Sequence, residues 1–372
     1  MLRGLVRAIE KRVSPIGQET IPCLKALGRI PAQTLKPGRD LPRFDVSALD
    51  GFACRGGGKE FIVRASLGPG EKLLFRLKPG EAVFVPTGAA IPSNTRFVPV
   101  EYVQEKGDRV LVETVHDLRK IWRKGYWIKK TDDVANKGES IRPRTMELLA
   151  LAGLKEIAVF RKPKVSILST GNELKKGIVA NSNQYLLAGL AERDGGEVAH
   201  VAVAGDEDKE IGEALSLMTG DDLLLVTGGT AKGKKDVTRS SFQLYGATFL
   251  LEDLPIVPGK TMTFGELDQT PFFILPGNPR ALRTLYEVFI KPCLSKLAGR
   301  RSSSMRCGKV SVPEDIEKEA DKILLIPVKL SADWSTCVKE LYVDEPDGFI
   351  ILERGIKRIR AGEEVEIQWA DA

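Results

Sequence analysis

The sequence is poor in the residues that most often bind transition metals or act as nucleophiles. Its five cysteines are scattered and form no CxxC pair, so neither a disulfide framework nor a structural zinc site is indicated. Only two histidines occur, His116 and His200. Zinc catalysis based on histidine and Ser-His-Asp chemistry are therefore poor hypotheses, and other residues must supply the chemistry.

Long hydrophobic runs and a strong excess of one charge are also missing. Apolar runs such as Leu223–Val226 reach about a third of a membrane-spanning length at most. The N-terminus is basic, but Arg7, Glu10 and Lys11 interrupt the apolar core that a signal peptide would need. Lys and Arg number 56 against 50 Asp and Glu, a surplus that suits small anionic substrates better than nucleic acid. We expect a cytoplasmic protein that binds neither membranes nor nucleic acid.

The length of the chain indicates several domains, because 372 residues exceed the roughly 100–200 residues of one domain. Leu2, Leu5 and Ile9 recur at helical spacing, and a second short helical pattern follows through residue 27. Helical signals return at 143–154. Residues 1–37 and 130–161 therefore predict an elongated helical domain, too thin to bury much area without another segment or subunit. Residues 38–129 show short β-like runs and turns, as in an inserted β domain.

Strands alternate with helices between residues 162 and 299, which is typical of a doubly wound, mostly parallel sheet. The pattern predicts strands at 165–168, 198–203, 222–227 and 272–275. It predicts helices at 184–193, 208–218 and 280–297, the last interrupted near Pro292. Residues 300–372 return to β patterning, which indicates a small β-barrel or sandwich.

Residues suited to binding anions follow the strands of this α/β region. Ser169–Glu173 follows the first strand, Thr227–Gly233 the third, and Pro276–Pro279 the fourth, with Pro258–Lys260 between the last two. Glycines let backbone N–H groups approach phosphate closely, and ligands of such sheets lie beyond the carboxyl ends of the strands. Each loop alone could be a tight turn. Together they predict a nucleotide or pterin phosphate site, distinct from the Walker A and GxGxxG motifs.

Two carboxylates, Glu173 and Asp236, lie in these loops and are natural ligands for a Mg²⁺ that neutralises pyrophosphate. The β domain carries a separate polar cluster in residues 45–53, where Asp45 and Asp50 flank Ser47. Thr87–Pro92 is a second loop of small and polar residues. Both β-domain segments could equally be structural turns.

Taken together, these motifs resemble the molybdopterin molybdotransferases, the family of MoeA and the gephyrin E-domain. The resemblance runs from the first helix to about residue 299 and continues weakly to the end. Six motifs carry it, in the family's order: Pro42–Ala53, Thr87–Pro92, Ser169–Leu174, Gly228-Gly229, Pro258–Lys260 and Leu275–Pro279.

The resemblance implies an α/β and β multidomain fold. Its parts are an elongated helical and dimerisation domain (1–37 and 130–161), an inserted β domain (38–129), a molybdopterin-binding-like α/β domain (162–299) and a small C-terminal β-barrel (300–372). It implies a homodimer with each active site between subunits. The implied activity is a Mg²⁺-dependent insertion of molybdate, or tungstate, into adenylated molybdopterin with release of AMP.

By position, the resemblance also implies roles for individual residues. The catalytic residues would be Asp50, Glu173 and Asp236, and the last two would hold the metal. The substrate-binding residues would be Ser47, Thr87, Asp133, Thr170, Asp206, Gly228, Gly229, Lys260, Pro276, Asn278 and Pro279.

The sequence departs from the family pattern near Pro258. Two positions where the family usually has lysine are Asp253 and Val257 here, so an oxyanion would lose two charge-assisted bonds of about 1.5–3 kcal/mol each. Lys232, Lys234 or Lys235 are the candidates for compensating cations. Two alternatives stay open. One is a divergent, non-catalytic protein that binds molybdopterin or its nucleotide. The other is a molybdopterin adenylyltransferase, whose G-G-T…D-x-T loop resembles residues 228–230 and 236–238.

Overall fold

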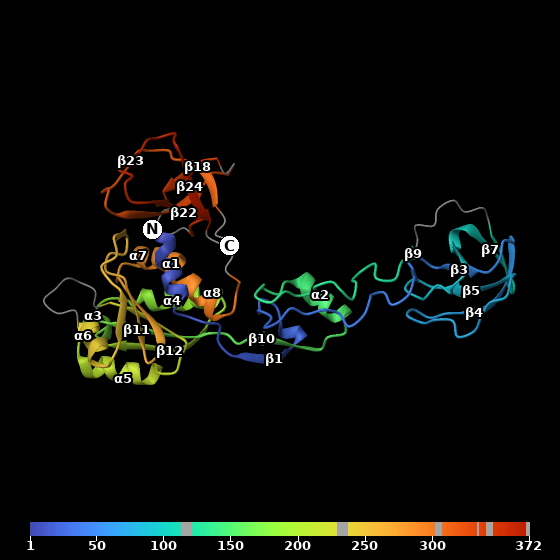
Figure 1. Cartoon of the computed structure of the whole chain (residues 1–372), viewed down its shortest axis with the longest axis horizontal. Helices are drawn as coiled ribbons and strands as arrows, with labels where there is room; N and C mark the ends of the chain where they lie inside the picture. Colours follow the sequence, from blue (N-terminus) through green and yellow to red (C-terminus); the bar gives the residue numbers. More distant parts are fainter. Residues whose placement is uncertain (113–120, 229–236, 302–306, 333–334, 340–344, 370–372) are drawn as a thin grey trace.

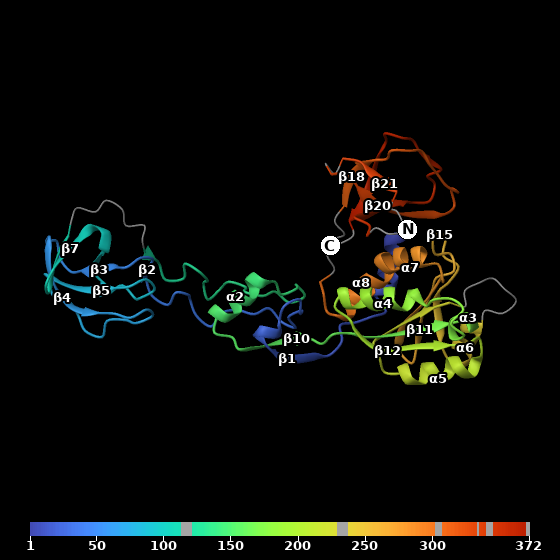
Figure 2. The ribbon, with the colours of Figure 1, turned by 180° about the vertical axis from the view of Figure 1, so that it is seen from behind.

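The molecule is elongated along one axis (Figures 1 and 2). The computed structural model describes residues 1–112, 121–228, 237–301, 307–332, 335–339 and 345–369. The α/β domain and the C-terminal β domain lie together at one end, a thin middle unit follows, and the inserted β domain forms the other end (Figure 1). Among the described residues, no helix has both the length and the apolar composition needed to cross a membrane.

The α/β domain is built on a six-stranded sheet with the order β12-β11-β13-β17-β16-β14. The first four strands are parallel, and β16 and β14 add an antiparallel edge. The parallel part confirms the doubly wound prediction; the antiparallel edge was not predicted. The strands are β11 (Lys164–Thr170), β12 (Glu197–Ala204), β13 (Leu223–Thr227), β14 (Thr248–Leu251), β16 (Thr263–Leu267) and β17 (Thr270–Leu275).

Helices cover both faces of this sheet, because successive strand residues point to opposite faces. Ile167 belongs to the core on one face, and its neighbour Leu168 to the core on the other. Both cores consist almost entirely of apolar side chains, which explains the continuous hydrophobic strands of the sequence. The helices are α3 (Asn172–Lys175), α4 (Ser182–Arg193), α5 (Asp208–Met218), α6 (Val237–Leu244), α7 (Pro279–Leu285) and α8 (Lys291–Leu297).

The long helix predicted at 280–297 is interrupted as expected. A π-helical segment, η3 (Tyr286–Ile290), separates α7 from α8. Pro292 lacks a backbone N–H, and its ring crowds the carbonyl of Val288 one turn earlier. The turn before a proline therefore widens, and π-type hydrogen bonding is one way in which a helix accommodates it.

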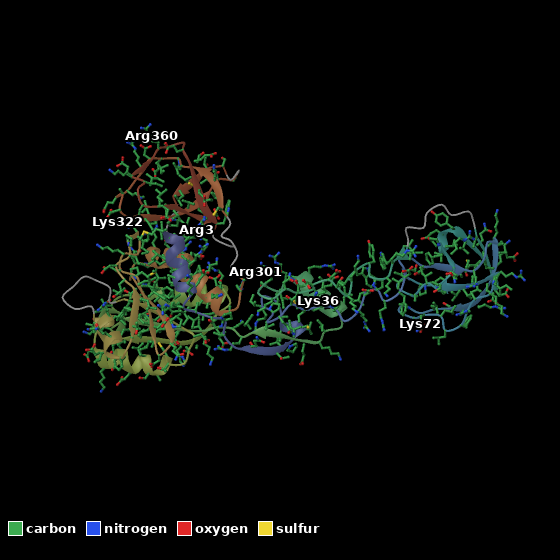
Figure 3. All side chains as sticks on the ribbon, in the orientation of Figure 1. Arg3, Lys36, Lys72, Arg301, Lys322 and Arg360 are labelled. Atoms are coloured by element: carbon green, nitrogen blue, oxygen red, sulfur yellow. The ribbon has the colours of Figure 1, made fainter. Side chains whose placement is uncertain are left out.

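The first helix, α1 (Leu2–Glu10), lies with the α/β domain and not with the middle unit, where the sequence pattern had placed it. Leu2, Val6 and Ile9 are buried in the same core as α8. An apolar helix face needs a large apolar partner, and the thin middle unit offers little such area. The helix also reaches the C-terminal domain, where Arg3 pairs with Glu366 at 3.4 Å (Figure 3).

The middle unit contains less helix than the sequence suggested. Strand β1 (Gln18–Pro22) pairs antiparallel with β10 (Glu156–Phe160). The predicted second helix is this strand followed by one 3₁₀ turn, η1 (Cys23–Lys25), and Leu24 is 89% exposed. Helix α2 (Pro143–Leu151) is present as predicted and buries Leu149 against this small core.

The inserted β domain is a six-stranded sheet with the order β6-β3-β5-β4-β8-β7, in agreement with the short β-like runs of residues 38–129. A two-stranded ladder of β2 with β9 lies at the side facing the middle unit (Figure 1). The elements are β2 (Val46–Ser47), β3 (Gly51–Cys54), β4 (Glu60–Ser66), β5 (Glu81–Val85), β6 (Arg96–Pro99), η2 (Val100–Tyr102), β7 (Val103–Lys106), β8 (Arg109–Val112) and β9 (Ile121–Trp122).

The C-terminal sheet is joined to the α/β domain by β15 (Ile256–Val257), which pairs in parallel with β20. The loop at Pro258 therefore begins at the seam between the two domains. The sheet runs β15-β20-β22-β24-β18, β21 pairs with β20, and a separate ladder joins β19 to β23. These strands are β18 (Cys307–Ser311), β19 (Ile316–Glu317), β20 (Ile323–Leu330), β21 (Cys337–Lys339), β22 (Gly348–Leu352), β23 (Arg358–Ile359) and β24 (Glu364–Trp369).

Candidate functional site

The loops predicted to bind phosphate start at one edge of the α/β sheet. In the parallel ladders, Ser169 is opposite Thr227, and Thr227 is opposite Leu275. Thr170 is opposite Ala204 on the other side. The carboxyl ends of β12, β11, β13 and β17 therefore lie in a row. The loops that follow them are neighbours in space although they are far apart in sequence.

The loop after β11 brings two of the predicted carboxylates to one turn. The backbone N–H of Asn172 donates to Asp206 Oδ2 at 3.1 Å, and Asp206 N–H donates to Asn172 Oδ1 at 3.4 Å. Glu173 folds back over Gly171, where a Cβ atom would lie only 2.6 Å from Glu173 Oε1. Glu173 and Asp206 are both exposed. The turn thus presents two carboxylates to solvent at the sheet edge.

Glu210 braces this turn, although the sequence analysis did not select it. Its carboxylate accepts from Lys175 Nζ at 2.6 Å and from Gly205 N–H at 2.7 Å. These bonds, with that from Lys175 foremost, lower the pKa of Glu210. The residue therefore stays ionised and ties α3 to the end of β12. Its position in the first turn of α5 was the available sequence signal.

Asn183 joins two further loops and was also missed. Its Nδ2 donates to Thr227 Oγ1 at 3.0 Å and to the Gly277 carbonyl at 2.9 Å. It thereby fixes the Pro276–Pro279 loop to the end of β13 from the start of α4. Its Oδ1 atom is buried and has no hydrogen-bond partner among the described residues. Nothing in the local pattern marks this asparagine, because its partners lie 44 and 94 residues away.

Thr170 and Gly228 form the packed base of the site. The Thr170 hydroxyl is buried and hydrogen-bonds the Thr238 hydroxyl at 2.8 Å, so it is not presented to solvent. Gly228 has a φ of +104° and lies directly on the Thr170 carbonyl. Only glycine adopts this conformation readily. Thr170 and Gly228 therefore shape the turn between β11 and β13.

A Gly228→Ala substitution is expected to destabilise the protein by about 3 kcal/mol, because backbone strain adds to the collision with the Thr170 carbonyl oxygen. Gly246→Ala is the matched control: its φ is +88°, but nothing lies within 4 Å of the added Cβ. It should cost about 1–2 kcal/mol. Urea unfolding of both variants measures the difference. Equal losses would show that Gly228 is not closely packed.

The Pro276–Pro279 loop meets the loop at Pro258. Asn278 Oδ1 accepts from the backbone N–H groups of Arg280 at 3.0 Å and Ala281 at 3.3 Å, and so caps α7, which begins at Pro279. Pro258 and Asn278 both line one cavity of about 440 Å³. Lys260, two residues after Pro258 in the sequence, is exposed. The structure thus brings the predicted loops around Thr170, Gly228, Pro276 and Pro258 to one region.

Part of the predicted site lies outside the described residues. This applies to Gly229, Asp236 and the three lysines Lys232, Lys234 and Lys235. Within the described ranges, no group of three or more His, Cys, Asp or Glu side chains is arranged to hold a metal ion. Mg²⁺ commonly takes only one or two carboxylates, with phosphate oxygens and water completing its coordination. The pair Glu173 and Asp206 fits that requirement.

The β domain carries its own polar pair. Asp50 Oδ1 accepts from Thr87 N–H at 2.8 Å and from Thr87 Oγ1 at 3.0 Å, and both residues are exposed. Ser47 is buried, and its hydroxyl hydrogen-bonds the backbone of Leu49. Ser47 therefore supports the Asp50 turn and does not present its hydroxyl to solvent.

Asp133 belongs to a third place, the middle unit. It pairs with Lys36 at 3.4 Å, and Lys36 lies between the α/β domain and the β domain (Figure 3). Asp50 immediately precedes β3, and Thr87 follows β5 by two residues. These strands are at one end of the molecule, whereas β11 and α3 are at the other (Figures 1 and 2). One chain therefore does not bring Asp50, Asp133 and Glu173 together.

Comparison with known proteins accounts for this combination of parts. The family model "MoeA N-terminal region (domain I and II)" matches residues 3–153, and the model "Probable molybdopterin binding domain" matches residues 166–296. The chain belongs to the MoeA family. Proteins of this family act in molybdenum cofactor biosynthesis, and curated relatives are named as transferases.

Individual MoeA relatives match over nearly their full length. A Methanocaldococcus jannaschii protein named for molybdopterin biosynthesis is 29% identical, over 92% of this chain and 90% of its own. The molybdopterin molybdenumtransferase of Staphylococcus epidermidis is 27% identical, over 98% and 94%. The crystal structure of a Pyrococcus horikosii MoeA protein is 26% identical, covers 100% of this chain and 99% of its own, and has a TM-score of 0.85.

The two departures from the MoeA motif can be placed in the structure. Asp253 adopts a left-handed backbone with a φ of +47° and is exposed. Val257 ends β15, opposite Leu324 of the C-terminal sheet, and is 38% exposed. Both positions therefore lie at the seam between the two domains, one on each side of Leu254–Ile256. Any cation that replaces the missing lysines must come from another part of the chain.

Proposed function

We propose that this chain inserts molybdate into adenylated molybdopterin and releases AMP in a Mg²⁺-dependent reaction. The observation that carries the proposal is the row of strand ends, where the Thr170, Gly228 and Pro276 loops are adjacent. The name of the S. epidermidis relative, molybdopterin molybdenumtransferase, supports the same assignment. A cytoplasmic location remains an expectation from the sequence.

The reaction divides between the parts of the site. Backbone N–H groups of the glycine loops would bind the pyrophosphate. Glu173 and Asp206 would hold Mg²⁺, which neutralises the phosphate charge when bound. Water then forms a bond to the AMP phosphorus, and the bond from that phosphorus to the bridging oxygen breaks. The products are AMP and molybdopterin. The two dithiolene sulfurs of molybdopterin then bond to the molybdenum of molybdate, while one molybdate oxygen leaves as water with the two thiol protons.

The proposal requires two copies of the chain. Asp50 and Thr87 lie at the opposite end of the molecule from Glu173 (Figure 1), and no bend within a folded domain would join them. A homodimer in which the β domain of one copy reaches the α/β domain of the other completes the set. Exposed apolar side chains on the middle unit, Leu24, Leu27 and Leu151, offer area for such an interface.

The direct test is AMP release from adenylated molybdopterin on addition of molybdate. We expect release that depends on both molybdate and Mg²⁺. A comparison of the release rates with molybdate and with tungstate shows which oxyanion the protein prefers. Substrate that binds with no AMP release under any oxyanion would contradict the proposal. That result would support the second candidate, a non-catalytic molybdopterin-binding protein.

Asp253 and Val257 are the observations that favour that second candidate, because they remove cations from the seam where an oxyanion would bind. The adenylyltransferase alternative is less well supported. It accounts for the α/β domain alone, whereas the MoeA N-terminal model matches residues 3–153.

A further inference from the structure

The net charge of the chain is divided unevenly between its domains. Residues 162–372, which form the α/β and C-terminal domains, contain 27 Lys and Arg against 32 Asp and Glu. The surplus of cations lies in the rest of the chain, where residues 38–129 contain 16 Lys and Arg against 11 Asp and Glu. The domains with the strand-end loops are therefore net negative, although the proposed substrates are anions. Cations from elsewhere would improve such a site.

Part of the surplus lies beside the polar pair of the β domain. Three segments of this domain are joined by backbone hydrogen bonds. Gly88 N–H donates to the Ser47 carbonyl at 2.8 Å, and Ala90 N–H donates to the Glu71 carbonyl at 2.9 Å. The segment that begins at Thr87 therefore lies between the two others. Cations that flank these segments are neighbours of the polar pair.

Two cations of this surface, Arg43 and Lys72, have no carboxylate partner within the described part of the chain. Both are exposed, and Arg43 makes neither a hydrogen bond nor an ion pair with any residue that the structure describes. Lys72 lies on the half of the β domain nearer the middle unit (Figure 3). Its Nζ atom is over the ring of Phe44, 5.8 Å from the ring centroid, and Arg43 directly precedes Phe44 in the sequence.

Other cations of the same surface are already paired. Arg123 pairs with Asp45 at 2.6 Å, and Lys124 pairs with Asp40 at 3.5 Å. A carboxylate partner competes with an incoming anion, and the two unpaired cations meet no such competition. A guanidinium group presents its N–H donors as a fork that fits two oxygens of one anion, whereas an ammonium group acts as a point charge. The unpaired arginine and lysine therefore form a surface suited to an oxyanion.

The site at the other end of the molecule lacks cations where an oxyanion would bind. Asp253 and Val257 occupy the two positions at which the family usually has lysine, and both are exposed. In the homodimer proposed above, the β domain of one copy reaches the α/β domain of the other. Its unpaired cations would then arrive together with Asp50 and Thr87.

We infer that Arg43 and Lys72 of one copy bind a tetrahedral oxyanion in the site of the other copy, and so replace the cations missing at positions 253 and 257. The oxyanion is molybdate or a phosphate of the adenylated substrate, because both present several oxygens around one centre. The inference rests on the proposed function and on its homodimer, and it adds two binding residues to that site.

Titrations of AMP release measure the role of the two cations. In the double variant Arg43→Ala/Lys72→Ala, the concentration that gives half-maximal release should rise at least about tenfold for the ligand that these residues bind. A rise for molybdate assigns them to molybdate, and a rise for adenylated molybdopterin assigns them to its phosphate. Arg43→Lys keeps the charge and should show a smaller rise. Unchanged values for both ligands in a folded double variant would overturn the inference.

The matched control is Arg96→Ala/Lys106→Ala, which removes the same two kinds of cation from the same domain. Both side chains are exposed, and Arg96 is opposite Cys54, at the end of β3 away from Asp50. The control should leave both concentrations unchanged. All four substituted side chains are exposed, so the variants should fold, and thermal unfolding verifies this. An equal rise in the control would show that only the net charge of the domain matters, and would overturn the assignment to Arg43 and Lys72.

Mixing shows whether the cations act across the dimer. The variant Arg43→Glu/Lys72→Glu repels the anion and should have little activity. After exchange with Glu173→Ala it should recover about a quarter of the wild-type activity, because one site of the mixed dimer is intact. After exchange with Asp50→Ala it should show no recovery, because both changes then lie in β domains. The reverse pattern would place the cations in the site of their own chain and overturn the inference.

Binding without turnover separates this inference from the catalytic proposal. Calorimetric titrations of the full-length protein use sodium molybdate and AMP as probes. Weaker binding of either probe by Arg43→Ala/Lys72→Ala, with no AMP release by the wild-type protein, would leave this inference standing and contradict the catalytic proposal. AMP release by the wild-type protein, with both titrations unchanged in the double variant, would do the reverse.

Discussion

Glu173→Ala should lower AMP release by about 100-fold or more, because it removes one of the two carboxylates that we propose to hold Mg²⁺ at the sheet edge. The fold should be unaffected, since the side chain is exposed. Glu173→Gln should retain some rate but need more Mg²⁺ to reach half of its maximum. Single-turnover AMP release at several Mg²⁺ concentrations measures both effects.

The matched control for this prediction is Glu192→Gln. Glu192 is an exposed glutamate of the same domain, on α4, and its replacement should leave the rate and the Mg²⁺ dependence unchanged. A Glu173→Ala protein that keeps at least half of the wild-type rate would exclude Glu173 from the reaction. The metal would then have to be held by residues outside the described part of the chain, such as Asp236.

The second large effect is a recovery of activity on mixing two inactive proteins. Asp50→Ala should be as inactive as Glu173→Ala, because Asp50 holds Thr87 through two hydrogen bonds at the end of the β domain. If each site takes Asp50 from one copy and Glu173 from the other, a mixed dimer has one intact site. Random exchange of equal amounts should then restore about a quarter of the wild-type activity.

Controls decide how such a recovery is understood. A protein that carries both substitutions in the same chain must stay inactive after the same exchange treatment. Mixing without subunit exchange, verified with differently tagged chains, must also give no recovery. No recovery after complete exchange would show that both residues act from the same chain, and the arrangement of Figure 1 would then have to change on substrate binding.

Local patterns in the sequence were enough to predict much of the fold. Short β-like runs between turns predicted the strands of the β domain. Continuous apolar runs predicted those of the parallel sheet, because burial on both faces dictates that pattern. Helix α5 was predicted with its observed ends, Asp208 and Met218. The errors occurred where a short apolar pattern had several possible partners. Helix α1 and the segment 21–27 are the two examples, since packing and not local propensity decided their place and form.

The candidate site divides in the same way. Glycine and proline motifs predicted the loops, because few other residues tolerate the backbone conformations of such turns. The braces that hold these loops were not predictable. Asn183 contacts Gly277 across 94 residues, and Glu210 contacts Lys175 across 35. Contacts of that range depend on how the finished sheet is covered by helices, which no local pattern specifies.

The sequence by itself determined the class of this protein: a doubly wound, mostly parallel sheet follows from apolar strands alternating with helices, and the loops at its strand ends follow from glycine and proline. Only the tertiary structure decided which of the motifs are neighbours. It placed Glu173 and Asp206 on one turn, moved Asp50 to the far end of the molecule, and closed a cavity between two domains. The physical reason is that chemistry at a site needs side chains within a few ångströms of one another, and distances of that kind are set by packing between elements and not by order along the chain.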